Sequence, residues 1–237
     1  MGAEAESEAV AVERMFAAIA PRYDLLNRLL SAGLDRRWRR LAVREAGLGV
    51  GARALDVCAG TADVALEVAR QVPGGGRIVG LDFAGPMLSL AGRKVARAGL
   101  GRRIALVRGS ALTLPFPAEA FDAALIAFGI RNVVDVKQAL AEMYRVVRPG
   151  GRAVILEFTL PRARIPRALY LWYFLRVLPR IGRAVSGHPS AYRYLPDTVT
   201  RWPSPEAFAG AMTEAGFREV RCALLTFGIV ALHVGLK

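Results

Sequence analysis

The stretch Arg53-Ala-Leu-Asp-Val-Cys58-Ala-Gly-Thr-Ala-Asp63 decides the fold of this chain. It begins as a short apolar run, passes through the small residues Ala59 and Gly60, and continues as a helical pattern from Asp63 onward. A strand, a tight turn and a helix in this order form the first half of a βαβ unit. The stretch therefore predicts a parallel sheet with a ligand-binding turn after its first strand.

The same alternation continues on both sides of this stretch. Residues 77–82 predict a second strand that ends in Asp82, and a helix follows through Met87, Leu90 and Val95. We expect strands at 104–108, 121–128 and 152–158, a helix at 134–147 that stops before Pro149-Gly150-Gly151, and helices at 12–30 and 36–45. Strands that alternate with helices favour an α/β fold with a doubly wound, mostly parallel, Rossmann-like sheet.

The end of the chain departs from this alternation. Residues 220–225 and 229–236 are two apolar runs joined by a short turn, which predicts a C-terminal antiparallel hairpin at the sheet edge. Residues 161–205 lack a strand pattern and are rich in Arg, Pro and aromatic residues, so we expect a helical insert, or lid, over the strand ends. The expected organisation is a single domain, 1–237, made of N-terminal helices (12–46), a cofactor-binding core (47–160), the lid (161–205) and a C-terminal helix and hairpin (206–237).

Composition limits the classes of function. The chain has 237 residues, of which 54% are hydrophobic and 22% charged, so it can bury a core. Its two Cys and two His are too few and too scattered for a metal site, and we expect no metal. Uncharged stretches are shorter than the ~18 residues of a membrane span, and the acidic N-terminus is unlike a signal peptide, which predicts a cytoplasmic protein. The net charge of +13 favours phosphate-bearing partners, whether nucleic acid or anionic lipid.

Acidic residues in and after the first turn indicate the ligand. The turn lacks the glycine pattern of a dinucleotide or triphosphate site, and Asp56 and Asp63 suit a cationic ligand beside Gly60. Asp82 lies about 20 residues further on, where a carboxylate can accept the hydroxyls of a ribose. Together these features suit S-adenosylmethionine. The alternative is that such aspartates only cap helices.

At this point the chain resembles the class I methyltransferases, and more narrowly the ubiquinone/menaquinone biosynthesis C-methyltransferase family. The form Asp-Val-Cys-x-Gly-Thr-Ala-Asp is similar to that of the demethylmenaquinone methyltransferases within it. Further segments agree: Tyr23 to Ser31 followed by Trp38, Phe128 to Asn132, Arg145 to Gly151 continuing to Thr159, and Tyr192-x-Tyr194-Leu-Pro196.

The resemblance implies roles for individual residues. Thr61 and Asp63 would hold the methionine end of S-adenosylmethionine and Asp82 the ribose. Around the adenine the resemblance places Met87, Ser110, Ala111 and the main chain of Ala127. The family often has Asn or Asp where Ser110 stands. Tyr23, Tyr192 and Tyr194 would contact the substrate.

The implied reaction converts prenylated demethylmenaquinol to menaquinol. Methyl transfer to a ring carbon needs an electron-rich ring, which forms when a neighbouring hydroxyl loses its proton. Arg131 would stabilise this quinolate or orient a water that takes the proton, and Asn132 would fix the ring hydroxyl. His188 is the histidine placed for proton transfer. Its alternative role is that of a loop residue bonded to the backbone.

The lid has a sequence pattern with two interpretations. Tyr170, Tyr173, Phe174 and Val177 fall on one helical stripe, whereas Arg176, Arg180 and Arg183 fall on another. This pattern is typical of an interfacial helix on anionic lipid, which would make the protein peripheral on the inner face of the cell membrane. The alternative is a lid helix with a solvated basic face. A homodimer is a further open alternative to a monomer.

Three other functions compete with this one. An RNA or DNA methyltransferase would explain the net charge, but base-methylating enzymes typically show Asp or Asn-Pro-Pro-aromatic after the fourth strand, where Gly129 to Asn132 stand here. We therefore expect no nucleic-acid partner. A cofactor-binding protein with a decayed site is disfavoured by the intact acidic turn. Sterol, tocopherol-precursor and phospholipid methyltransferases share the core fold, and only the N-terminal and Tyr-x-Tyr-Leu-Pro motifs exclude them. Within the resembled family a dual ubiquinone/menaquinone C-methyltransferase stays open, because Asp56-Val-Cys58 gives only a hint of the ring type.

Overall fold

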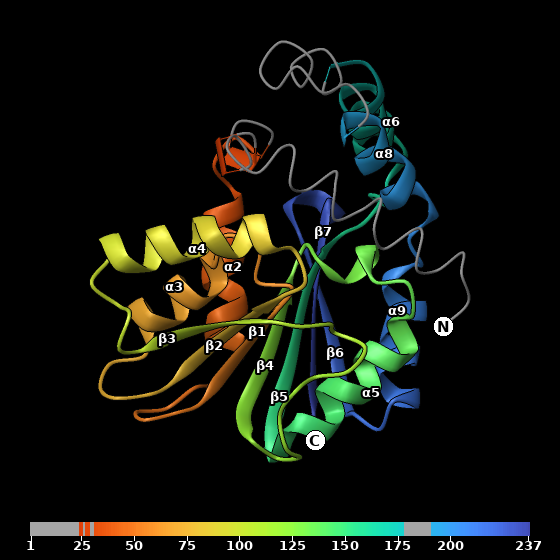
Figure 1. Ribbon diagram of the computed structural model, residues 1–237. Helices are drawn as coiled ribbons and strands as arrows, with labels where there is room; N and C mark the ends of the chain where they lie inside the picture. Colours follow the sequence, from red (N-terminus) through yellow and green to blue (C-terminus); the bar gives the residue numbers. More distant parts are fainter. Residues whose placement is uncertain (1–23, 26, 29–30, 178–190) are drawn as a thin grey trace.

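Seven strands form one sheet in the computed structural model, which describes residues 24–237 apart from 26, 29–30 and 178–190 (Figure 1). Their order across the sheet is β3-β2-β1-β4-β5-β7-β6. The strands are β1 (Ala54–Val57), β2 (Ile78–Asp82), β3 (Ile104–Arg108), β4 (Phe121–Ala127), β5 (Val147–Phe158), β6 (Arg218–Leu225) and β7 (Val230–Leu236).

The pairing confirms the mixed sheet expected from the sequence. β1 pairs in parallel with both β2 and β4, so the strand order reverses beside β1. β2 pairs in parallel with β3, and β4 with β5. The hairpin of β6 and β7 is antiparallel, and β7 also pairs antiparallel with β5. A switch point of this kind is where doubly wound sheets bind their ligands.

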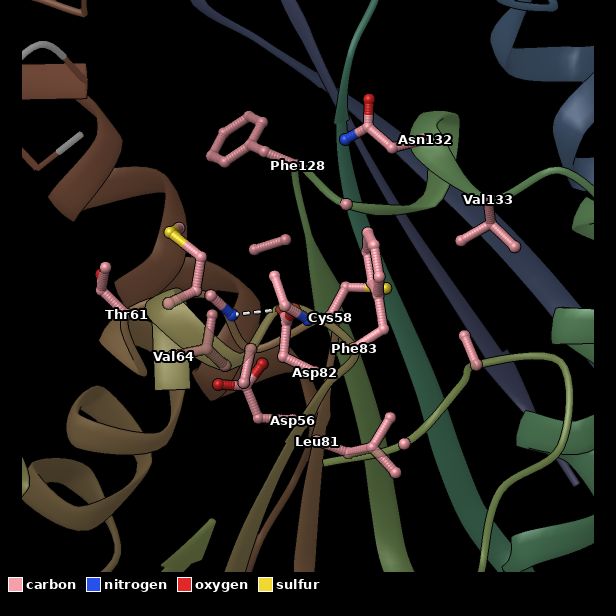
Figure 2. A pocket seen from close by; sticks show the side chains of 18 of the residues that line it. Asp56, Cys58, Thr61, Val64, Leu81, Asp82, Phe83, Phe128, Asn132 and Val133 are labelled. Atoms are coloured by element: carbon pink, nitrogen blue, oxygen red, sulfur yellow. Dashed lines mark hydrogen bonds between the residues drawn. The ribbon is translucent and has the colours of Figure 1, made fainter. Parts of the chain in front are cut away.

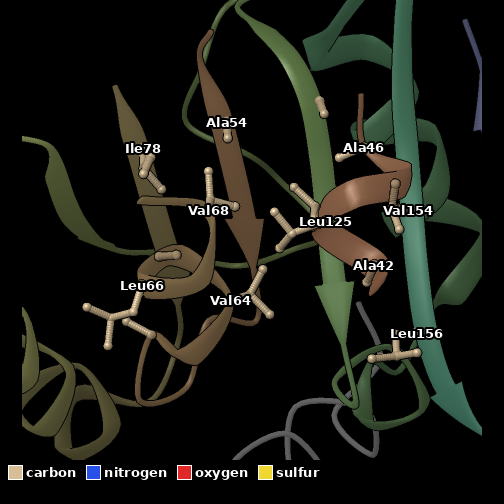
Figure 3. Packing of buried hydrophobic residues seen from close by; sticks show 14 of the residues in the cluster. Ala42, Ala46, Ala54, Val64, Leu66, Val68, Ile78, Leu125, Val154 and Leu156 are labelled. Atoms are coloured by element: carbon tan, nitrogen blue, oxygen red, sulfur yellow. The ribbon is translucent and has the colours of Figure 1, made fainter. Parts of the chain in front are cut away.

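Helices cover both faces of the sheet (Figure 1). One face carries α2 (Asp35–Glu45), α3 (Asp63–Gln71) and α4 (Gly85–Arg97), and the other carries α5 (Val136–Val146) and α9 (Pro205–Glu214). Figure 3 shows Val64 and Val68 of α3 and Ala42 of α2 packed against Leu125 of β4. These side chains recur at helical spacing, which is why an amphipathic pattern located the helices in advance.

The start of β5 differs from the expectation. We expected Pro149-Gly150-Gly151 to separate a helix from a strand beginning at residue 152, but β5 begins at Val147, directly after α5. Val147 pairs with Phe121, and the register then shifts before Ala123. Gly150, at a φ of 75°, donates its N–H to the carbonyl of Lys237. Residues 148–151 have no partner in β4, but Val147 and Arg152 on either side do, so proline and glycine here mark an irregularity inside the strand.

The lid lies beyond the carboxyl end of β5, at the opposite end of the sheet from the C-terminus (Figure 1). It contains α6 (Arg164–Trp172), the π-helical turn η2 (Tyr173–Val177) and α8 (Ala191–Arg201). The described helices include none that is both long and apolar enough to span a bilayer. Most of the expected helix at 12–30 falls outside the described residues, although 24–25 and 27–28 are helical.

Candidate functional site

A cavity of about 270 Å³ opens at the carboxyl ends of β1, β2 and β4, beside the switch point (Figure 2). It therefore lies where the order of the strands predicts it. Many of the residues expected to bind the cofactor line it: Asp56, Gly60, Thr61, Asp63, Asp82, Met87, Ser110, Ala111 and Ala127.

The turn after β1 has a backbone conformation that residues other than glycine rarely adopt. Cys58, Gly60 and Ala62 all have positive φ, at 56°, 53° and 64°. Strain of this kind persists where surrounding contacts enforce it. Here Ala59 donates its N–H to the carbonyl of Leu81, and the turn delivers the chain into α3 at Asp63. The turn therefore forms one wall of the cavity and is held in place by the neighbouring strand.

Asp82 fixes this turn from the end of β2. One carboxylate oxygen accepts the N–H of Gly60 at 2.7 Å, and the other accepts the N–H of Ala84, just before α4, at 2.9 Å (Figure 2). Asp82 also lines the cavity, and a carboxylate offers about four lone-pair sites in all. Asp82 therefore has the capping role of the alternative interpretation and can also receive ribose hydroxyls.

Asp56 lies at the base of the cavity. Its side chain is buried and accepts the N–H of Ala65, in the first turn of α3, at 3.0 Å. Burial raises the pKa of Asp56 to about 8, although the bond from Ala65 opposes this, and the charge of Asp82 adds to it. At neutral pH the side chain is thus mostly protonated without a ligand. A cation in the cavity would favour its ionised form.

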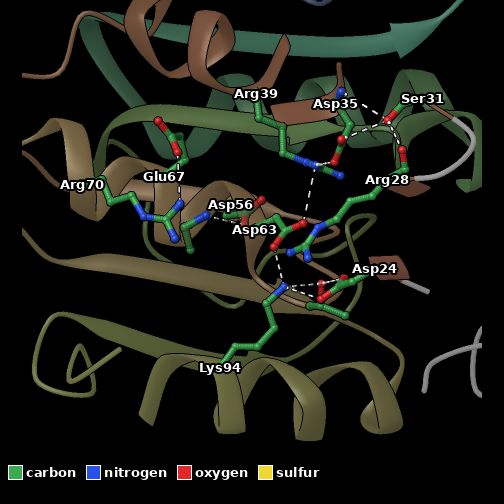
Figure 4. A network of polar contacts seen from close by, with 12 residues as sticks. Asp24, Arg28, Ser31, Asp35, Arg39, Asp56, Asp63, Glu67, Arg70 and Lys94 are labelled. Carbon is green, nitrogen blue, oxygen red and sulfur yellow. Dashed lines mark hydrogen bonds and ion pairs between the residues drawn. The ribbon is translucent and has the colours of Figure 1, made fainter. Parts of the chain in front are cut away.

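A charged network closes one side of the cavity (Figure 4). Lys94 contacts Asp63, and its Nζ lies 2.7 Å from Oδ2 of Asp24 and 3.0 Å from Oγ1 of Thr61. Arg39 Nη1 lies 3.5 Å from Asp63. Burial alone would raise the pKa of Asp63, but the charges of Arg39 and Lys94 outweigh it and lower that pKa.

Arg39, Lys94 and Asp24 were not identified from the sequence. Arg39 is buried in α2, where its Nη1 lies 2.5 Å from Oδ2 of Asp35, four residues earlier. The i, i+4 spacing of this pair is visible in the sequence. Nothing in the sequence shows, however, that α2 packs on α3 and brings the pair to Asp63.

The residues expected around the adenine include one apolar side chain, Met87, and one polar side chain, Ser110. Met87 is buried, and an added Cβ on Gly60 would lie 3.4 Å from its Cε. Ser110 Oγ accepts the N–H of Leu112 at 3.1 Å, which leaves its hydroxyl proton free to be donated. The cofactor role of these residues stays a prediction.

Arg131 and Asn132 lie in the short 3-10 helix η1 (Ile130–Asn132), which follows β4. Asn132 lines the cavity, and Figure 2 shows it above the acidic turn. Arg131 Nη1 lies 2.5 Å from Oε1 of Glu157 and donates to the carbonyl of Phe128 at 2.9 Å. Burial raises the pKa of Glu157 although the charge of Arg131 opposes it.

Several expected site residues lie outside the described residues. These are Tyr23 and His188, together with Arg180 and Arg183 of the basic stripe. Tyr192 and Tyr194 belong to α8, but their side chains are not described. His233, the other histidine, is buried in β7 with Nε2 2.9 Å from the carbonyl of Pro205, so it is a core residue. No cluster of His, Cys, Asp and Glu that could hold a metal is present in the described ranges.

Solved structures show the class of the fold. A methyltransferase from Aquifex aeolicus, described as S-adenosylmethionine-dependent, superposes with a TM-score of 0.64 over 90% of this chain and 97% of its own, at 17% identity. A second, from Methanococcus maripaludis, gives 0.65 over 92% and 91%, at 18% identity. The fold is that of the class I methyltransferases.

The profile of the ubiE/COQ5 methyltransferase family matches residues 3–237, and the chain belongs to that family. It is 52% identical to the ubiquinone/menaquinone biosynthesis C-methyltransferase of Geobacter sulfurreducens, over 95% of this chain and 88% of the relative. It is also 52% identical to the demethylmenaquinone methyltransferase of Thermus thermophilus, over 93% and 99%, and 50% identical to that of Deinococcus radiodurans, over 96% and 92%. The predictions of the family, of a methyltransferase and of S-adenosylmethionine as cofactor are confirmed.

Proposed function

We propose that this methyltransferase converts a prenylated demethylmenaquinol to menaquinol by methylating a ring carbon. The observation that carries the proposal is the Arg131–Asn132 pair beside the cavity, where Asn132 lines the wall and Glu157 holds Arg131. Two relatives at 50–52% identity bear the name demethylmenaquinone methyltransferase, which supports the same substrate. Another relative at 52% bears a dual ubiquinone/menaquinone name, so a benzoquinol is the second candidate substrate.

The described residues suit S-adenosylmethionine. Asp82 lines the cavity, where its carboxylate would accept ribose hydroxyls, and the carboxyl groups of Asp56 and Asp63 favour a cationic ligand. Arg39 would receive the carboxylate of the methionine end, since it lines the same cavity and already lies beside Asp63. Thr61 would hold the same end, with Met87, Ser110, Ala111 and Ala127 around the adenine.

The reaction needs an ionised ring oxygen. When bound, S-adenosylmethionine supplies an electrophilic methyl group on a positively charged sulfur. Loss of the hydroxyl proton pushes electrons into the ring, a ring carbon takes the methyl group, and the proton on that carbon then leaves as the oxygen recovers its own. Arg131 stabilises the negative oxygen, and Asn132 fixes the ring by a hydrogen bond.

The residue that takes the hydroxyl proton stays a prediction. Arg131 is a poor base because guanidinium groups keep their proton in proteins. His188 is our candidate, with Tyr192 and Tyr194 as weaker ones.

Aromatic rings would exclude water from the cavity near Phe128. Phe128 and Phe158 pack with ring centroids 4.5 Å apart, and Trp38 lies against both, at 6.0 and 6.3 Å. Exclusion of water strengthens the attraction between a cation and a quinolate.

Two substitutions separate cofactor binding from turnover. Asp82→Ala should abolish S-adenosylmethionine binding in calorimetry, while Arg131→Ala should retain binding and lose at least 100-fold in turnover. Circular dichroism of Asp82→Ala is the control for folding, because this substitution also removes the acceptors of the Gly60 and Ala84 N–H groups. A fully active Arg131→Ala enzyme would contradict the mechanism.

We also propose that the lid docks on an anionic membrane, where a polyprenyl substrate resides. Two of the four residues of the predicted apolar stripe, Tyr170 and Phe174, are buried in the protein, so they cannot contact a membrane. The structure exposes a different set instead, which we name the apolar ridge: Ile165, Leu169, Trp172 and Leu175, with exposed fractions of 54–75%. Arg164, Arg167 and Arg176 are exposed along the same two elements and suit anionic headgroups.

Vesicle binding tests the apolar ridge. The double variant Leu169→Ser, Trp172→Ser should lose binding to phosphatidylglycerol vesicles, whereas Val50→Ser, at an even more exposed apolar site before β1, should bind like the wild type. Changing Arg176, Arg180 and Arg183 to Glu should have the same effect as the ridge variant. Unchanged binding in both variants would reject the membrane role. A location on the inner face of the membrane and a homodimer stay predictions.

A further inference from the structure

Three buried polar atoms of η1 and the lid have no hydrogen-bond partner among the described residues, and one of them belongs to Asn132, which lines the cavity. They are Nε of Arg131, Oδ1 of Asn132 and Oη of Tyr170. A buried polar atom without a partner destabilises the fold, so buried polar groups nearly always have a partner. Only two further buried atoms of the described residues share this property, in Arg103 and His233. The grouping of three unpaired polar atoms in and around η1 therefore indicates that a polar ligand binds there.

Aromatic contacts bring Tyr170 of the lid to η1. Tyr170 stacks on Phe174 with centroids 4.6 Å apart, and Phe174 lies 6.4 Å from Phe158. The guanidinium of Arg131 lies 5.5 Å from the centre of the Phe158 ring. The charges of Arg131 and Glu157 both act on the Tyr170 hydroxyl. Tyr170 is only 7% exposed, so its hydroxyl faces the interior between the lid and the sheet.

We propose that Tyr170 is a substrate-contacting residue that completes the quinol site from the lid. Its hydroxyl and Nε of Arg131 donate hydrogen bonds to the ionised ring oxygen, and Oδ1 of Asn132 accepts one from the hydroxyl that stays protonated. This inference rests on the proposed function, because it assigns the three atoms to the two oxygens of a quinol ring.

The donors and acceptors match this assignment. Burial raises the pKa of Tyr170 far above neutrality, so the side chain keeps its proton and can donate it to an anion. Nη1 of Arg131 is already used by Glu157 and by the carbonyl of Phe128, which leaves Nε for the ligand. Donors arranged in advance around a developing negative charge in a dry site give the largest stabilisation.

Glu157 acts in this arrangement as a positioning residue. It is 1% exposed, and its Oε2 lies 3.4 Å from the backbone N–H of Arg131 while Oε1 holds Nη1. Both the helical turn η1 and the guanidinium are therefore fixed by one carboxylate of β5. The quinol does not need to contact Glu157.

Tyr170→Phe tests the inference, because it removes one oxygen and keeps the ring that packs on Phe174. We expect a fall in kcat of about 100-fold, the effect of removing one such donor. The acid limb of the pH–rate profile should also move to higher pH, because the quinolate loses stabilisation. Binding of S-adenosylmethionine, measured by calorimetry, should not change. The matched control is Tyr144→Phe in α5, which packs on Phe217 away from the cavity and should keep the wild-type kcat.

Glu157 has its own test. Glu157→Ala should lower kcat, and Glu157→Gln, whose amide oxygen still accepts from Nη1, should restore most of it. Wild-type kcat and pH profile in Tyr170→Phe, with an inactive Arg131→Ala, would overturn this inference alone. A wild-type enzyme that methylates no quinol would instead overturn the proposed function and the inference with it.

Discussion

The buried carboxyl group of Asp56 makes the stability of the folded protein depend on pH. Because the folded protein holds a proton on Asp56 up to a pKa of about 8, whereas the unfolded chain releases it near 3.8, unfolding releases this proton at intermediate pH. The stabilisation is fully present below pH 3.8 and is lost as pH rises through 8. Asp56→Asn cannot titrate but still accepts the N–H of Ala65, so it should lack this dependence.

The size of the effect follows from the two pKa values. A difference of about four pH units between the two pKa values, at about 1.4 kcal/mol for each, gives about 6 kcal/mol in all. The free energy of unfolding of the wild type, minus that of Asp56→Asn, should therefore fall by up to about 1.4 kcal/mol per pH unit in this window. Well above pH 8, where Asp56 is ionised in the folded protein as well, the difference should become constant.

Urea unfolding at a series of pH values from 5 to 9, followed by circular dichroism, measures this difference. Asp122→Asn is the control: burial alone would raise the pKa of Asp122, but bonds from Arg53 and Arg148 lower it, so Asp122 stays ionised in both states above pH 5. Its difference from the wild type should be flat. A flat difference for Asp56→Asn as well would refute the buried, protonated state of Asp56.

The remaining predictions concern the cofactor, the turn and the charged network. Affinity for S-adenosylmethionine should rise between pH 6.5 and 8.5 as Asp56 ionises. Affinity for S-adenosylhomocysteine, whose sulfur is uncharged, should not rise. Equal pH dependence of the two affinities in calorimetry would contradict the preference for a cation. Gly129→Ala would place a Cβ 2.6 Å from Cβ of Cys58 and should destabilise the protein by about 1–3 kcal/mol. Gly210→Ala in α9, where a Cβ meets no described atom within 4 Å, should instead stabilise it by about 0.5–1 kcal/mol; equal melting temperatures of the two variants would contradict the steric argument. Arg39→Met should cost about 3–5 kcal/mol, because buried Asp35 loses its cation and keeps only the hydroxyl of Ser31 as a side-chain partner. Adding Asp35→Leu should recover most of this loss; a double variant no more stable than the single one in urea would show that the pair is not the cause.

The fold was largely predictable because its elements follow local periodicity. β3 has the predicted bounds, 104–108, and α2 begins one residue before the predicted start. The error at β5 arose because proline and glycine at residues 149–151 signal a chain break, whereas the partners that keep this segment in the sheet, Phe121 and Lys237, are distant in sequence.

The candidate site was predictable where a motif lies on one turn. Asp56, Asp63 and Asp82 were found because strand ends converge at one edge of a parallel sheet. The partners of Asp63 and Arg131, which are Arg39 and Glu157, were missed because packing between elements brings them there. The apolar ridge was missed for a similar reason, since α6 carries two apolar stripes and only tertiary contacts decide which one is buried.

The account depends most directly on the acceptor of the methyl group. The measurement is transfer of label from methyl-labelled S-adenosylmethionine to reduced prenylated demethylmenaquinone, to the equivalent prenylated benzoquinol and to structured RNA, each in detergent. We predict label on a ring carbon of the naphthoquinol, and label on both ring types would identify a dual quinone methyltransferase. Label in RNA alone would contradict the account.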